Sequence, residues 1–139
     1  GVRVVCNYID DVYRVAEIFE RQKDVEILKK QDYIKEPNYN GYRSLHLDTR
    51  IPVYLSDRTE YVVAEIQLRT IAMDFWASLE HDIRYKVDKT KLPGGINEEM
   101  FDCAEKIAEI DRQMQDMYRR IKAAEKADEA RAGKRPRIP

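Results

Sequence analysis

The chain has 139 residues, of which 43% are hydrophobic and 37% are charged, enough apolar material for one domain with one core. Its 25 basic and 26 acidic residues leave a net charge of −1, which excludes a general electrostatic attraction to nucleic acid or anionic membranes. No apolar run is long enough to span a bilayer, and the first residues lack the pattern of an export signal. Cys6 and Cys103 form no motif, and two free thiols fit a reducing compartment, so we expect a cytoplasmic protein.

Apolar periodicity and turn formers divide the chain into alternating strands and helices. The first half is expected to contain strand 2–6, a helix to residue 21 capped by Asp10 or Asp11, strand 24–32 and an irregular loop 33–43. Strands 44–54 and 60–69 follow, joined by a hairpin turn at 55–58. The second half is expected to contain a helix to residue 86 capped by Thr70, a loop 89–95 and a long helix 97–127. This order predicts an α/β (α+β) fold with a mixed sheet, flanked by helices and followed by a long C-terminal helix.

The same pattern divides the chain into three regions. We expect a core at 1–88, a helical region at 89–127 and a disordered basic tail at 128–139. The chain opens with Gly1 and not with Met, so we expect it to be part of a longer protein.

Polar side chains alternate with apolar ones along the two strands of the expected hairpin. Glu65, Gln67 and Arg69 fall on one face of strand 60–69, about 7 Å from neighbour to neighbour. A turn near residue 56 places His46 opposite Gln67 and Asp48 opposite Glu65. One sheet face then gathers carboxylates, an imidazole, an amide and a guanidinium group. The alternative is an ordinary solvated face of an antiparallel hairpin, with His46 as a structural histidine.

The loop before this hairpin favours a binding site over a solvated face. Residues 40–44 deliver the ring of Tyr42 and the guanidinium group of Arg43 to the edge of the same face. An aromatic ring can stack on a base, cations can meet phosphates, and carboxylates can hold magnesium, so the combination suits a nucleotide. Tyr42 alone is equally consistent with a half-buried loop anchor.

Three segments carry a resemblance to a known family. They are Asn-Gly-Tyr-Arg-Ser-Leu-His at 40–46, Glu-Ile-Gln-Leu-Arg-Thr at 65–70, and Ala-Met-Asp-Phe-Trp-Ala-Ser-Leu-Glu-His at 72–81. Their order and spacing resemble the RelA/SpoT-type synthetase domain, in particular the small alarmone synthetases of bacteria. The resemblance implies a nucleotidyltransferase-like fold and transfer of the β,γ-pyrophosphate of ATP to the 3′-hydroxyl of GDP or GTP. The product is the stringent-response alarmone (p)ppGpp. The implied cofactor is Mg²⁺, and the implied assembly is a homotetramer formed through helices.

The resemblance also implies a role for each residue that matches the family's motifs. These roles are catalysis and metal binding for Glu65, binding of the guanosine nucleotide for Tyr42, His46, Gln67 and Asp74, contact with the adenine of ATP for Arg3, and phosphate contact or scaffolding for Arg43 and Arg69. Whether Glu65 acts as the base or mainly as a metal ligand stays open.

The chain departs from the family pattern at several positions. Asn38 and Gln31 stand where many relatives have basic residues, and the family has a second metal-binding aspartate two residues before Gly1. Basic residues that hold the ATP phosphates lie farther upstream in the family. We therefore expect residues 1–139 by themselves to make little or no alarmone.

Other functions are consistent with the same sequence. One is a catalytically impaired nucleotide-binding or oligomer-forming module. Another is a regulatory protein that binds single-stranded RNA through the basic tail, which loss of binding on deletion of 128–139 would reveal. A heptad seam on the long helix favours self-association, although it could instead pack on its own domain. The seam comprises Met100, Cys103, Ile107, Ile110, Met114, Met117, Ile121 and Ala124.

Overall fold

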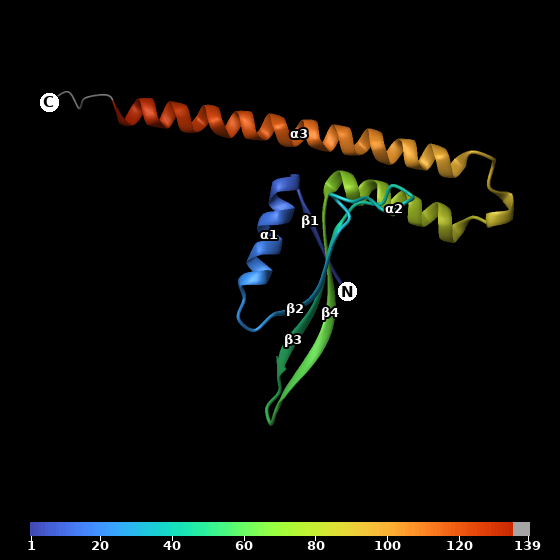
Figure 1. The fold of residues 1–139 in the computed structure, drawn as a ribbon, viewed down its shortest axis with the longest axis horizontal. Helices are drawn as coiled ribbons and strands as arrows, with labels where there is room; N and C mark the ends of the chain where they lie inside the picture. The colour runs from blue at the N-terminus through green and yellow to red at the C-terminus, as the bar shows by residue number, and fades with distance from the viewer. Residues whose placement is uncertain (135–139) are drawn as a thin grey trace.

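A mixed four-stranded sheet forms the centre of the computed structural model, which describes residues 1–134 (Figure 1). In chain order the elements are β1 (Val2–Cys6), α1 (Ile9–Arg21), β2 (Glu26–Asp32), β3 (Leu45–Tyr54), β4 (Thr59–Thr70), α2 (Ile71–Lys86), a short 3-10 helix (Lys89–Lys91) and α3 (Ile96–Gly133). The strands lie in the order β1-β4-β3-β2, with β1 parallel to β4 and the other pairs antiparallel. The expected fold class, a mixed sheet with flanking helices and a long C-terminal helix, is confirmed.

The hairpin of β3 and β4 has the register that the sequence alternation predicts. His46 pairs with Gln67 and Asp48 pairs with Glu65. The turn closes with a hydrogen bond from the Leu55 amide to the carbonyl oxygen of Arg58, 2.8 Å long. Because side chains alternate between the two faces of a strand, this register puts all the predicted polar groups of the hairpin on one side.

The core lies between α1 and the apolar face of the sheet. Val12 and Ala16 of α1 are buried against β3 and β4. The strand residues of this core are Leu45, Leu47, Ile66 and Leu68, with Cys6 from β1. The apolar face is covered only in part, because the hairpin extends past the end of α1 (Figure 1). Val53 and Val62, near the hairpin turn, therefore remain 40% and 48% exposed.

The starts of the first two helices differ in how they are capped. Thr70 caps α2 as predicted, since its Oγ1 accepts a hydrogen bond of 3.2 Å from the Met73 amide. The cap expected for α1 is wrong. Tyr8 is its N-cap residue, and Asp10 and Asp11 lie inside the first turn, where negative charge complements the helix dipole.

Helix α3 lies across one end of the sheet, alongside α2 and above the start of α1 (Figure 1). It runs to Gly133 and so continues past the expected end at residue 127 into the segment expected to be a disordered tail. The rest of that tail, residues 135–139, lies outside the described part of the chain. Within residues 1–134, no helix combines the length and apolar character needed to cross a membrane.

Candidate functional site

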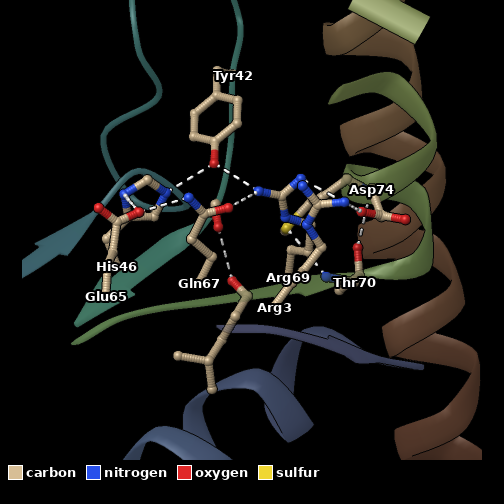
Figure 2. Close-up of polar contacts among 11 residues, drawn as sticks. Arg3, Tyr42, His46, Glu65, Gln67, Arg69, Thr70 and Asp74 are labelled. Atoms are coloured by element: carbon tan, nitrogen blue, oxygen red, sulfur yellow. Dashed lines mark hydrogen bonds and ion pairs between the residues drawn. The ribbon is translucent and has the colours of Figure 1, made fainter. Parts of the chain in front are cut away.

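The face of the sheet opposite α1 holds a connected set of polar side chains (Figure 2). They come from three strands, the tyrosine loop and the start of α2, and the strand residues lie together because β1 and β3 both pair with β4. The β1 register places Arg3 beside Gln67, and the β3 register places His46 on the other side of Gln67. Residues that are far apart in the sequence thus form one row across the sheet.

Arg69 connects this row to the tyrosine loop. Its Nη2 donates to the hydroxyl of Tyr42 at 2.8 Å and to Oε1 of Gln67 at 2.7 Å, and its Nη1 donates to Oδ1 of Asp74 at 3.4 Å. We expected Arg69 to be displayed on the open face, but only 3% of it is exposed. Arg69 is therefore a buried link between Tyr42, Gln67 and Asp74, and its Nε has no hydrogen-bond partner among the described residues.

His46 and Glu65 complete the network at its other end. The hydroxyl of Tyr42 lies 2.8 Å from Nε2 of His46, and Gln67 donates to Oε1 of Glu65 at 2.6 Å (Figure 2). Because Arg69 donates to the Tyr42 hydroxyl, that hydroxyl can give its own proton to Nε2. The ring proton of a neutral His46 then lies on Nδ1, which is 3.8 Å from Glu65.

Burial is the main influence on the charge state of His46. It lowers the pKa of the imidazole, and Arg69 lowers it further, while Glu65 and Asp48 raise it. The net pKa lies below the ordinary histidine value, so the ring is neutral at pH 7. A neutral ring can accept the Tyr42 proton, which agrees with the hydrogen-bond pattern.

The two remaining predicted cations have different surroundings. Arg3 is 3.6 Å from Oδ1 of Asp74, and its side chain is 55% exposed, so it is open to a ligand. The side chain of Arg43 is only 10% exposed and bonds Glu105 and a carbonyl group of α3. The structure thus brings Arg3, Tyr42, His46, Glu65, Gln67, Arg69 and Asp74 together and turns Arg43 toward α3.

Glu65 is the residue of this face that fits a metal ion. No group of three or more His, Cys, Asp or Glu side chains within residues 1–134 is placed to bind one alone. Magnesium is usually held by one or two carboxylates together with substrate phosphates and water. The Glu65 side chain is 44% exposed, and only its Oε1 takes the bond from Gln67. It therefore suits a magnesium ion that is shared with a bound nucleotide.

Sequence patterns missed part of the support for this site. Tyr33 packs its ring edge-on against the rings of Tyr42 and His46, with centroids 6.0 and 5.2 Å away. Asp111 of α3 accepts a 2.5 Å hydrogen bond from Thr70, next to Arg69. Asp111 is 5% exposed, and burial raises the pKa of its carboxyl group. Its helical spacing from Ala104 and Ala108, which places it on the same buried face of α3, was a signal that could have pointed to a buried role.

Comparison with known proteins gives this geometry a family. Residues 1–90 match the family model described as "Region found in RelA / SpoT proteins". The chain belongs to the RelA/SpoT family. The GTP pyrophosphokinase YwaC of Bacillus subtilis (strain 168) is 49% identical to this RelA/SpoT chain over 114 residues, which cover 82% of the chain and 54% of YwaC. The chain therefore spans about half the length of that relative.

Solved structures of RelA/SpoT relatives share the fold. Small alarmone synthetase 2 from Bacillus subtilis has a TM-score of 0.80 at 46% identity, covering 85% of this chain and 64% of that one. Small alarmone synthetase 1 from the same organism, bound to its product pppGpp, has a TM-score of 0.77 at 32% identity, covering 86% and 60%. Both likenesses cover more of this chain than residues 1–90, so they extend into α3.

Proposed function

We propose that this chain is the nucleotide-binding and catalytic region of a GTP pyrophosphokinase. It would transfer the β,γ-pyrophosphate of ATP to the 3′-hydroxyl of GDP or GTP and so make (p)ppGpp in the stringent response. The observation that carries the proposal is the hydrogen-bonded path from Tyr42 through Arg69 and Gln67 to Glu65. It links an aromatic ring suited to a base with an exposed carboxylate suited to the reacting hydroxyl.

Tyr42 would hold the acceptor nucleotide. Its hydroxyl is fixed by Arg69 and His46, and its ring is half-buried, so one part of the ring can stack on guanine without a large loss of side-chain entropy. The similar small alarmone synthetase 1 supports this, since it was solved with its product pppGpp bound. Gln67 and Asp74, both bonded to Arg69, would line the same pocket.

Glu65 would act on the reacting hydroxyl. A ribose hydroxyl is a weak nucleophile at neutral pH and needs a base within hydrogen-bond reach. Glu65 is exposed and sits on a central strand, held by Gln67, which gives it a defined position. Mg²⁺, when bound, would neutralise charge on the ATP phosphates, and Glu65 would be one of its ligands. Arg3, exposed at the β1 side of the same face, would contact the adenine of ATP.

Replacement of Glu65 tests this proposal in the full natural protein. Glu65→Gln keeps the shape of the side chain but removes the charge, so we expect turnover of ATP and GDP to fall by about 100-fold or more. GDP affinity, measured by calorimetry, should change less than about threefold, because Glu65 lies away from the ring of Tyr42. Glu60→Gln, an exposed glutamate near the hairpin turn that pairs with Arg58, is the matched control. Glu65→Gln turnover within about threefold of wild type would refute the assignment.

We also propose self-association through α3. Ala104, Ala108 and Gln115 face the body of the protein and are buried, whereas Ile110 and Met114 are 57% and 45% exposed. This second face favours contact between copies, and the homotetramer is the assembly that the family resemblance implies. Ile110→Asp with Met114→Asp should yield a smaller species by light scattering, and Glu109→Gln should not. An unchanged mass for a folded double variant would contradict self-association through this face.

The remaining expectations about partners and location are also proposals. The reaction would take place in the cytoplasm, in keeping with Cys6 and Cys103 both being free thiols. Binding of single-stranded RNA through the basic tail stays an alternative, and loss of binding on deletion of residues 128–139 would support it. Arg135 and Arg137 of that tail lie outside the described residues.

A further inference from the structure

One turn of α3 makes close contact with the residues on both sides of Tyr42. Before the tyrosine, Gly41 has φ +96°, and a Cβ added there would lie 2.6 Å from Cβ of Ala104. Glycine is therefore required at position 41 for two reasons: the backbone is left-handed there, and Ala104 leaves no space for a Cβ atom. Ala104 itself is only 3% exposed. The loop thus rests directly on the small side chain of Ala104.

After the tyrosine, Arg43 binds the same turn of α3. Its Nη1 donates to the carbonyl oxygens of Gly41, at 3.1 Å, and Ala104, at 3.3 Å. Its Nη2 donates to Oε1 of Glu105 at 2.7 Å. One of these bonds holds the guanidinium group to the loop and the other two hold it to α3, so Arg43 connects the loop to the helix.

The loop between these two contacts has little freedom of its own. The Asn38 amide donates to the carbonyl oxygen of Tyr42 at 3.0 Å, and the Gly41 amide donates to the carbonyl oxygen of Asn38 at 2.9 Å. The cavity left between Gly41, Arg43 and α3 has a volume of about 10 Å³, room for one water at most. A shift of Ala104 or Glu105 would therefore reach Tyr42 through its two neighbours, because Gly41 rests on Ala104 and Arg43 binds Glu105.

We propose that Ala104 and Glu105 of α3 are positioning residues for the acceptor nucleotide. They set where the ring of Tyr42 stands, so they control affinity for GDP or GTP and not for ATP, whose expected contact Arg3 lies on β1. The inference rests on the proposed function of Tyr42. It assigns part of the acceptor site to a helix that lies beyond residues 1–90, the segment matched by the family model.

Two variants and two matched controls test this inference in the full natural protein. Glu105→Gln weakens a half-exposed ion pair and should raise the KM for GDP about threefold. Ala104→Leu displaces the loop and should raise it on the order of tenfold or more. The KM for ATP should stay within about twofold in both. Glu109→Gln and Ala123→Leu make the same changes at exposed positions of α3 and should leave both KM values unchanged.

Hydrogen exchange gives a readout that does not depend on activity. The amides of Asn38 and Gly41 should exchange faster in Ala104→Leu and Glu105→Gln than in wild type and in the controls. Unchanged exchange in both variants, or an equal rise in the KM for GDP and ATP, would overturn the inference. If Ala104→Leu does not fold, Glu105→Gln decides, because its side chain is 49% exposed and has no part in the core. If the wild-type protein does not convert ATP and GDP at all, the proposed function is refuted. Hydrogen exchange of the Asn38 and Gly41 amides would still test whether α3 holds the tyrosine loop in place.

Discussion

Replacing Tyr42 by phenylalanine separates the two tasks that the structure gives to this residue. The ring is the proposed platform for guanine, and the hydroxyl holds Arg69 and His46 at 2.8 Å each. Tyr42→Phe keeps the ring and removes both hydrogen bonds. Tyr42→Ala removes the ring as well, so the comparison between the two variants isolates stacking.

The expected magnitudes follow from these contacts. A hydrogen bond to a charged donor and one to a neutral ring, both half-buried, together stabilise the fold by about 2 kcal/mol. For a domain of this size that corresponds to a fall in Tm of about 6 °C in Tyr42→Phe. GDP affinity should change less than about threefold in Tyr42→Phe. Tyr42→Ala should lose a further 1–3 kcal/mol of binding, about 5- to 150-fold, because the stacking ring is gone.

Thermal unfolding followed by circular dichroism and calorimetric titration with GDP measure the two effects separately. Equal losses of GDP affinity in the two variants would refute the stacking role, since phenylalanine retains the ring. A Tm of Tyr42→Phe within about 1 °C of wild type would show that the hydroxyl does not hold the network.

Two further predictions concern pH. Because the pKa of His46 is lowered, its unfolded form binds protons first, so stability is lost as the pH falls toward the folded pKa. The free energy of unfolding in urea should stay nearly constant from pH 8 to about 6.5 and fall below that, because the unfolded chain takes up the proton at the ordinary histidine value while folded His46 resists it, and His46→Gln should remove this part of the pH dependence. The pKa of Asp111 is raised, so its carboxyl group ionises first in the unfolded chain and stability falls as the pH rises through the folded pKa. Asp111→Asn still accepts from Thr70, so its free energy of unfolding in urea should match or exceed wild type at pH 7; a marked loss at pH 7 would contradict this.

Alternation along the strands was enough to predict the hairpin and its register. His46 opposite Gln67 and Asp48 opposite Glu65 follow from a period of two and a short turn, and both pairs are confirmed. Periodicity could not show that β1 joins the sheet beside β4 and brings Arg3 next to Gln67. A parallel pairing depends on how the intervening elements pack, which no local pattern specifies.

The burial of Arg69 shows why the site itself was harder to predict. Alternation places its side chain on the polar face, and that much is correct. The loop with Tyr42 and the start of α2 with Asp74 then cover it, and both contacts depend on tertiary structure. Likewise, nothing local distinguishes Arg43 as a contact to α3 from a phosphate ligand, because its partner Glu105 is 62 residues away.

The dependence of the acceptor loop on α3 also has a consequence for biosynthesis. Arg43 meets α3 across 62 residues, and Asp10 at the start of α1 meets Gln115 and Arg119 across 105 and 109 residues. Contacts of such long sequence separation form late and slow the folding of a chain. The sheet can pair as soon as β4 has left the ribosome, but Tyr42 has no support on one side until α3 follows. A nascent chain halted after α2 would therefore hold the strand residues of the site in place while the tyrosine loop stays unanchored.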